Sequence, residues 1–162
     1  MKITVGLPAY NEEEKIASII TRLKTVADQI IVCNDGSTDL TGKIAECMGV
    51  IVVNHPKNLG YGAAIKSLFQ KFVESQSDIL VTFDADGQHN YKEIPELLQP
   101  IIEGKADITM GTRFKRAQDI AQVPASRKLV LKGAIIVNGL LTGMWLTDAH
   151  NGFRALNRIA MS

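Results

Sequence analysis

Apolar residues follow two alternating patterns along the chain. Short runs rich in β-branched residues, typical of buried strands, occur at 3–7, 30–33, 50–53, 79–83 and 107–110. Between them, apolar residues recur at the three- and four-residue spacing of amphipathic helices. The first predicted helix begins at Glu12, and the second covers about 39–48. The third carries Ile65, Leu68, Phe69 and Phe72 on one face, and the fourth covers about 93–103 with Ile102 among its inward residues. Pro8 is expected to end the first strand.

Alternation of strands and helices predicts βαβ units, and hence an α/β fold with a mostly parallel sheet covered by helices on both faces. Ligands of such sheets bind outside the carboxyl ends of the strands. Three polar loops follow strand ends directly, at Pro8–Glu12, Asn34–Asp39 and Asp84–Gln88. We therefore expect them to converge on one rim and to form a site there.

The pattern changes after residue 112. Arg113–Lys132 is basic and polar, whereas Gly133–Leu146 contains no charged residue and is too short to span a bilayer. A buried helix is the default interpretation of the uncharged stretch, and an apolar surface lying in a membrane interface is the alternative. A last helix is expected to begin near Arg154.

Composition and charge narrow the function classes. The chain has 162 residues, which fits one domain, and a net charge of +1, which does not suggest a nucleic-acid binder. Residues 1–112 carry 10 basic and 15 acidic side chains, and residues 113–162 carry 8 basic and 2 acidic ones, so the second part is suited to binding anions.

The two cysteines, Cys33 and Cys47, form no CxxC pair, which argues against a disulfide framework or a zinc site and favours a reducing compartment.

Asp84-Ala85-Asp86 is the strongest chemical feature of the sequence. Two carboxylates at i and i+2 after a buried strand can direct oxygens at one Mg²⁺ or Mn²⁺, and Gln88 offers an amide oxygen nearby. Asp35, also at a strand end, is placed to accept hydrogen bonds from a base or ribose. The GxGxxG and P-loop patterns are absent, which argues against NAD and simple NTPase sites. His55 and His89 are isolated in the sequence, and a supporting or exposed position is favoured for His89.

Six motifs occur in series: PAYNE at 8–12, NDGSTD at 34–39, NLGYGAA at 58–64, DADGQ at 84–88, GTRF at 111–114 and DAHNGFR at 148–154. Together they resemble the family 2 glycosyltransferases of the GT-A fold, a Rossmann-like α/β fold. The resemblance is closest to the dolichyl-phosphate (polyprenyl-phosphate) mannosyl- and glucosyltransferases. It implies one catalytic domain over 1–162, with a nucleotide-sugar and metal half at 1–112 and an acceptor-side half at 113–162. Because such relatives continue further, the chain is expected to be truncated at its C-terminus.

The resemblance also implies a role for each matching residue. Nucleotide-sugar binding is implied for Pro8, Tyr10, Asn11, Glu12, Asp35, Asp84, Ala85, Asp86 and Arg113. The metal ligands would be Asp84, Asp86 and Gln88, and the catalytic residues Asp86, Arg113, Arg127 and Asp148. Arg113 and Arg127 would meet phosphate groups. Asp148 would orient the acceptor or, for a hydroxyl acceptor, act as base.

The activity implied is inverting transfer of a hexose from a nucleotide sugar, GDP-mannose or UDP-glucose, to a polyprenyl (dolichyl) phosphate with Mg²⁺ or Mn²⁺. A cytoplasmic enzyme in peripheral contact with the cytosolic face of a membrane would meet that acceptor. A family 2 enzyme acting on a glycan or other hydroxyl acceptor, or a non-catalytic nucleotide-sugar-binding domain, remains open. A sugar-1-phosphate nucleotidyltransferase is disfavoured because the first loop is acidic rather than glycine-rich and basic.

Overall fold

The computed structural model describes residues 1–86, 89–111 and 152–161. By its internal contacts the chain divides into two compact units, Met1–Thr109 with Gly152–Ser162 and Met110–Asn151. The first unit contains almost all of the described residues. The uncharged stretch Gly133–Leu146 lies outside the described residues.

Strands and helices alternate through the chain, as the hydrophobic pattern predicts. In chain order they are β1 (Ile3–Ala9), α1 (Glu13–Leu23), β2 (Gln29–Asn34), α2 (Thr41–Cys47), β3 (Ile51–Asn54), α3 (Tyr61–Glu74), β4 (Ile79–Thr82), the 3₁₀ turn η1 (Tyr91–Glu93), α4 (Ile94–Ile102), β5 (Ile108–Met110), β6 (Arg154–Asn157) and the 3₁₀ turn η2 (Ile159–Met161). None of the helices in the described ranges is long and apolar enough to cross a bilayer.

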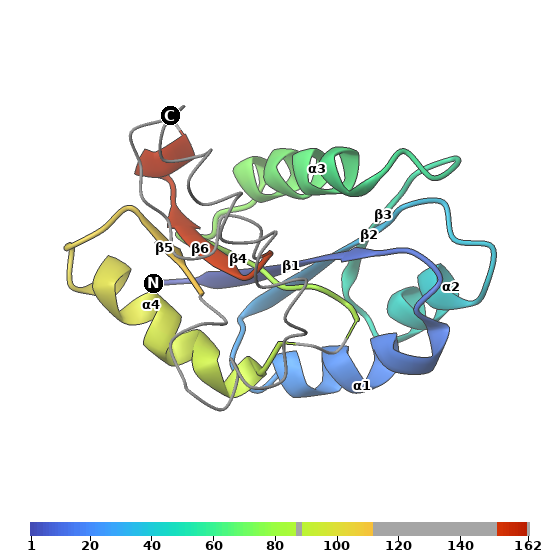
Figure 1. Ribbon diagram of the computed structural model, residues 1–162, viewed down its shortest axis with the longest axis horizontal. Helices are drawn as coiled ribbons and strands as arrows, with labels where there is room; N and C mark the ends of the chain where they lie inside the picture. Colours follow the sequence, from blue (N-terminus) through green and yellow to red (C-terminus); the bar gives the residue numbers. More distant parts are fainter. Residues whose placement is uncertain (87–88, 112–151, 162) are drawn as a thin grey trace, which may run out of the picture. The chain divides into compact units, whose positions relative to one another are not determined.

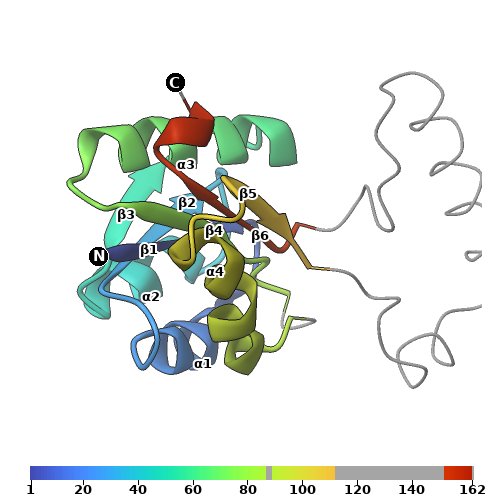
Figure 2. The ribbon, with the colours of Figure 1, turned by 90° about the vertical axis from the view of Figure 1, so that its left-hand side faces the viewer.

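The strands form one mixed sheet in the order β3-β2-β1-β4-β6-β5. β1 pairs in parallel with β2 and with β4, β2 pairs in parallel with β3, and β6 runs antiparallel to β4. Helices α1, α2 and α4 cover one face of the sheet, and α3 covers the other with η2 beside it (Figures 1 and 2). The predicted α/β architecture is therefore confirmed.

The strand order reverses at β1. From β1 the chain builds outward through β2 and β3, and then returns to place β4 on the other side of β1. In doubly wound sheets a crevice opens at such a reversal, outside the carboxyl ends of the two strands concerned. Here those ends carry the loops that follow Ala9 and Thr82.

The core lies between the sheet and its helices. The inward faces of α1 and α4 pack on β1, β2 and β4, and all four apolar residues predicted to line α1 are buried: Ile16, Ile19, Ile20 and Leu23. On the opposite face, Ala64 and Leu68 of α3 pack on Ile31 and Cys33 of β2. The guanidinium of Arg158 lies 5.4 Å from the ring centroid of Phe72 and donates to backbone carbonyls just before β4, which fastens the end of β6.

Three details of the sequence prediction are wrong. Pro8 does not end β1 but pairs with Cys33 inside it. Proline has no backbone N–H to donate, and the nitrogen of Pro8 faces β4. The last hydrogen bond between β1 and the β4 segment runs from Phe83 N–H to the Gly6 carbonyl, before Pro8, so no hydrogen bond between these strands is lost. Ile102 is 55% exposed, because α4 ends there and its last turn leaves the core.

The third error is at the C-terminal end of the described chain, where residues 154–157 form β6 instead of a helix. Ala155 and Leu156 are both buried, because this part of the sheet is covered on both faces. Two adjacent buried residues match neither strand alternation nor helical periodicity, so the local pattern cannot separate the two states. Pairing with β4 decides the outcome.

Candidate functional site

The polar loops gather at the carboxyl-end rim of the sheet, as expected. Strand pairing aligns Ala9 with Asn34, Asn34 with Asn54, and Gly6 with Thr82, so the loops after β1 to β4 leave the sheet at one edge. β6 is antiparallel, so it begins at this same edge, with Arg154 opposite Thr82. The predicted convergence of the three loops is thus confirmed for their described residues, and the start of β6 joins them.

The loop after β1 and the loop after β2 are fastened to each other by reciprocal hydrogen bonds. Backbone N–H groups of Asn11, Glu12 and Glu13 donate to side-chain oxygens of Ser37, Thr41 and Asp39 at 3.0, 2.8 and 3.1 Å. In return, Asn11 Oδ1 accepts from Thr38 N–H at 2.9 Å and Glu13 Oε2 from Leu40 N–H at 2.9 Å. Asn11 has φ +55°, a value that asparagine tolerates better than most residues. The polar motif residues thus build the rim itself.

Asp35 holds the loop that leads into α3. Its Oδ1 accepts from Leu59 N–H at 2.9 Å, and its Oδ2 accepts from Gly60 N–H at 2.9 Å. The residue is 4% exposed. Burial alone would raise the pKa of this carboxyl group, but hydrogen bonds from Leu59, His55 and Gly60 outweigh burial and lower the pKa below its ordinary value.

His55 supports Asp35 from beneath the rim. Its Nδ1 lies 2.6 Å from Asp35 Oδ1, and its Nε2 lies 2.8 Å from Ser67 Oγ on α3. Cys33 Sγ is 3.6 Å from the same Nε2. Burial, with the Asp35 charge second, raises the pKa of the Cys33 thiol to about 11, so this cysteine stays a neutral thiol.

Asp84, in the loop after β4, is contacted by one side chain from α3 and one from the segment before η1. Tyr61, the first residue of α3, donates its hydroxyl to Asp84 Oδ1 at 3.1 Å. Nε2 of His89 lies 2.9 Å from Asp84 Oδ2. Burial and then the charge of Asp84 raise the pKa of Tyr61 to about 12, so its hydroxyl stays protonated near neutral pH.

Two further features surround this carboxylate. The His89 ring stacks on Phe153 at 5.3 Å between centroids with planes 24° apart, and it meets Phe83 edge-on at 5.5 Å. The carbonyl of Gly152 accepts from Thr82 Oγ1 at 2.6 Å. A Cβ on Gly152 would stand 2.4 Å and 2.6 Å from the Asp84 oxygens, so only glycine fits against them.

The donor set at this turn fits a hard divalent cation. Asp84 and Asp86 supply carboxylate oxygens, the ligands that Mg²⁺ and Mn²⁺ prefer. Among the described residues no group of three or more His, Cys, Asp or Glu side chains gathers as a cation cage. In proteins, Mg²⁺ is usually bound by one or two carboxylates together with substrate phosphates.

Of the residues predicted for nucleotide-sugar binding, those in the described ranges all lie on the rim loops or the strand ends below them. Tyr10 is 45% exposed, Pro8 is partly buried in β1, and Ala85 is buried under the Asp84–Asp86 turn. Glu12 pairs with Lys15 at 3.3 Å. Gln88, Arg113, Arg127 and Asp148 lie outside the described residues, so their roles stay predictions.

Sequence reasoning did not identify the partners of these carboxylates. Tyr61 and Gly152 lie inside motifs that the sequence displays, but nothing in the pattern shows that they meet Asp84. His55 and His89 have no histidine or cysteine near them in the sequence that would indicate a site, and their carboxylate partners are 20 and 5 residues away. Only the order of the strands brings these groups together.

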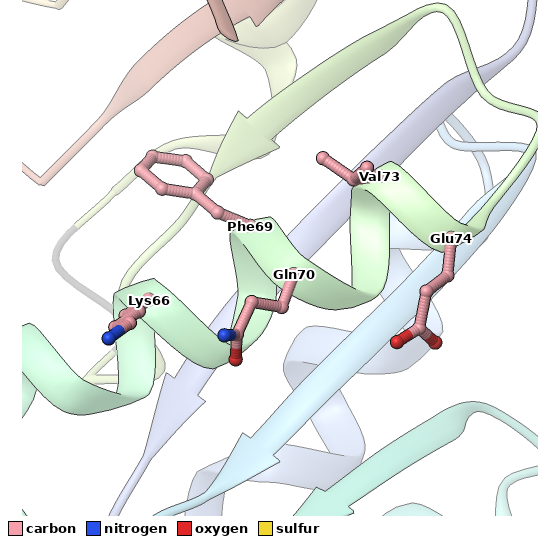
Figure 3. A pocket seen from close by; sticks show the side chains of 5 residues that line it. All are labelled: Lys66, Phe69, Gln70, Val73 and Glu74. Carbon is pink, nitrogen blue, oxygen red and sulfur yellow. The ribbon is translucent and has the colours of Figure 1, made fainter.

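A shallow groove also runs along the outer side of α3. It has a volume of about 600 Å³ and is lined by Lys66, Phe69, Gln70, Val73 and Glu74. Figure 3 shows that all five side chains come from this helix. The groove lies beyond the first turn of α3, which is the part at the rim, and it contains none of the rim residues.

Comparison with known proteins places these features in context. The chain matches the family model described as Glycosyl transferase family 2 over residues 4–161. A UDP-N-acetylglucosamine–dolichyl-phosphate N-acetylglucosaminyltransferase of Methanococcus voltae is 34% identical over 96% of this chain and 69% of its own length. A dolichol-phosphate mannosyltransferase of Pyrococcus furiosus is 32% identical over 98% of this chain and 47% of its own length.

The chain is also similar to solved structures. Glucosyl-3-phosphoglycerate synthase from Mycobacterium tuberculosis, in complex with Mn²⁺ and UDP-glucose, matches with a TM-score of 0.68 and 26% identity. That match covers 98% of this chain and 56% of the synthase. The predicted GT-A fold is thereby confirmed, and the chain spans just over half the length of that structure.

Proposed function

This chain belongs to glycosyl transferase family 2, and on that premise we propose that it transfers a hexose from a nucleoside-diphosphate sugar to a polyprenyl phosphate with the help of Mg²⁺ or Mn²⁺. The observation that carries the proposal is the position of the Asp84–Asp86 turn. It follows β4 at the reversal of strand order beside β1, where doubly wound sheets bind nucleotides. Relatives named as dolichyl- and polyprenyl-phosphate transferases support the acceptor class.

The rim offers separate places for the parts of the donor. The exposed ring of Tyr10 and the loop that Asp35 holds would receive the base and ribose at the ends of β1 and β2. The carboxylates of Asp84 and Asp86 would hold the divalent cation on the diphosphate. A similar synthase has been solved in complex with Mn²⁺ and UDP, which supports a site that takes both a divalent cation and a nucleoside diphosphate.

The difficult step is departure of the nucleoside diphosphate, which gains negative charge as the anomeric bond breaks. A bound divalent cation supplies Lewis-acid stabilisation of that charge. Asp84 and Asp86 would hold the cation, and Arg113 and Arg127 are proposed to add cationic hydrogen-bond donors to the phosphates. A phosphate monoester acceptor has a second pKa of about 6 and is largely ionised at pH 7, so it needs little help from a base. Asp148 is then proposed to orient the acceptor.

The distribution of charge along the chain supports a site of action at a membrane. Residues 113–162 carry 8 basic and 2 acidic side chains, and they include the uncharged stretch Gly133–Leu146. We therefore place the enzyme in peripheral contact with the cytosolic face of a membrane that carries the anionic lipid acceptor.

A transfer assay tests the proposal. Purified protein is incubated with Mn²⁺, membranes and labelled GDP-mannose or UDP-glucose, and label in the lipid extract is counted. We expect label from one donor and its loss in Asp86→Ala, with Asp28→Asn, a change at the opposite edge of the sheet, as the control that keeps activity. Label that appears only on a peptide, glycan or other non-lipid acceptor would refute the polyprenyl assignment.

One observation favours a second candidate acceptor. The same solved synthase also appears with Mn²⁺, UDP and phosphoglyceric acid. A small phosphorylated hydroxyl acceptor is therefore included as a separate arm of the assay, with phosphoglycerate replacing the membranes. Transfer to phosphoglycerate, with none to lipid, would favour this candidate.

Metal dependence has a simpler test. Donor addition should raise the melting temperature more with Mn²⁺ than with EDTA, and Asp86→Ala should remove this metal-dependent part. An unchanged metal-dependent shift in that variant would show that the cation binds elsewhere.

A further inference from the structure

The carboxylate of Asp84 has a hydrogen-bond donor at each oxygen. Tyr61 Oη lies 3.1 Å from Oδ1, and His89 Nε2 lies 2.9 Å from Oδ2. The terminal torsion of an aspartate is broad and only weakly staggered, so an isolated carboxylate samples many orientations. Donors on both oxygens select one of them. A carboxylate has about four acceptor positions, so hydrogen-bond donors and a cation can share one such group.

Both donors are mounted on rigid parts of the fold. The His89 ring is stacked on Phe153 and meets Phe83 edge-on, and these two phenylalanines are 4% and 2% exposed. An ionised carboxylate only accepts, so the His89 nitrogen that faces Asp84 carries the hydrogen. Packing against these two buried rings therefore fixes the direction of this N–H.

Tyr61 is fixed through its backbone. The two preceding residues, Leu59 and Gly60, donate their N–H groups to the buried carboxylate of Asp35 at 2.9 Å each. Gly36, next to Asp35, packs so closely on this loop that a Cβ would stand 2.2 Å from the carbonyl carbon of Lys57. The loop is thus held by Asp35 after β2, and the residue that follows it, Tyr61, reaches Asp84 after β4.

Gly152 lies against the Asp84 carboxylate from a third direction. Any side chain there would collide with both Asp84 oxygens and with the Tyr61 hydroxyl, which lies 2.6 Å from the position of a Cβ. The backbone at Gly152 therefore lies close against Tyr61 and Asp84, and it is held in place through the bond from Thr82.

We propose that Tyr61 and His89 are positioning residues, which act through Asp84 by holding its carboxylate in the orientation that binds the divalent cation. The inference rests on the proposed function in one respect, the assignment of Asp84 as a cation ligand. Groups that orient metal ligands in this way typically contribute a factor of 10–100 in metal affinity. Removing either donor should therefore weaken cation binding about tenfold while leaving the contacts with the base intact.

Mn²⁺ binding measured by calorimetry in the presence of UDP tests this inference without any turnover. Tyr61→Phe removes only a hydroxyl, and His89→Phe keeps a ring that can stack on Phe153. Tyr91→Phe is the matched control, because it removes the same hydroxyl from a tyrosine that packs against the hydrophobic core from η1. Asp84→Asn reports on the cation site itself.

We expect about a tenfold higher Kd for Mn²⁺ in Tyr61→Phe and in His89→Phe, a parental Kd in Tyr91→Phe, and no measurable binding in Asp84→Asn. Affinity for UDP in EDTA should stay parental in the Tyr61 and His89 variants, which separates positioning from general damage to the rim. A parental Mn²⁺ Kd in either variant, with binding lost in Asp84→Asn, overturns the role of that residue and leaves the proposed function standing. Parental Mn²⁺ binding in Asp84→Asn would instead overturn the metal site and this inference with it.

Discussion

Replacing Asp35 by asparagine tests whether its carboxylate holds the rim together. In the parent, Leu59 N–H, Gly60 N–H and His55 Nδ1 all approach this one group at 2.9, 2.9 and 2.6 Å. Asparagine keeps the shape and one acceptor oxygen, but it replaces the other oxygen by an NH₂ that can only donate. One of these three groups then loses Asp35 as its acceptor, and of the three only Gly60 N–H has a second acceptor that does not depend on Asp35, Asn58 Oδ1 at 2.9 Å.

The expected loss of stability follows from these contacts. A hydrogen bond to a charged group contributes about 1.5–3 kcal/mol, and the bonds that remain lose the strengthening that the negative charge provides. We therefore expect Asp35→Asn to lower the free energy of unfolding by about 3 kcal/mol. For a chain of this size, such a change lowers the melting temperature by roughly 6–12 °C.

The effect should also depend on pH in a definite direction. The pKa of folded Asp35 lies below its ordinary value of 3.8, so the ionised group stabilises the fold at pH values above 3.8. This stabilisation is lost as the pH falls from 3.8 through the folded pKa. The difference between parent and variant should therefore be full at about pH 7 and shrink in acid.

Urea denaturation followed by circular dichroism at neutral pH and at a series of acidic pH values measures both effects. Glu14→Gln, which removes an exposed carboxylate from the first turn of α1, is the control and should cost less than about 1 kcal/mol. If Asp35→Asn costs no more than this control at neutral pH, or if its effect does not shrink in acid, the reasoning about the Asp35 carboxylate is refuted.

Three further predictions concern backbone fit, the end of β6 and the cysteines. Gly36→Ala should cost about 3 kcal/mol or more in denaturant unfolding, whereas Gly49→Ala, at a similar φ of +69° but in open space, should cost only about 1–2 kcal/mol. Equal costs would refute the close packing. Arg158→Met keeps the aliphatic stem but loses two hydrogen bonds and the cation over an aromatic ring, so unfolding free energy should fall by about 2 kcal/mol. Maleimide at about pH 8 should label the native protein at exposed Cys47 and leave buried Cys33, whose pKa is about 11, for reaction after unfolding, as mass spectrometry of peptides would show.

Much of the fold could be predicted because each of its early elements carries its own periodic signal. The stripe from Ile16 to Leu23 specifies an amphipathic helix without reference to the rest of the chain. β6 could not be predicted in this way. Its four residues become a strand through pairing with β4, from which they are more than 70 residues distant.

The candidate site could likewise be predicted only in part. Motifs at strand ends were sufficient to locate Asp35 and Asp84, because parallel strands deliver their carboxyl ends to one edge. The partners of these carboxylates depend on geometry that no local pattern encodes. His55 reaches Asp35 across 20 residues, and Tyr61 reaches Asp84 across 23.

The place of β6 in the sheet also bears on how the chain folds. Among the described strands, β6 is the last in sequence, yet it lies between β4 and β5, so none of these strands pairs with β5 until β6 arrives. During synthesis, a nascent chain that has emerged through Met110 presents β4 as an unpaired edge, open to other chains. Closing the sheet requires contacts of high sequence separation, which are slow to form. Shortening the chain before Arg154 should therefore yield protein that aggregates, even though the rim loops after β1 and β2 are complete.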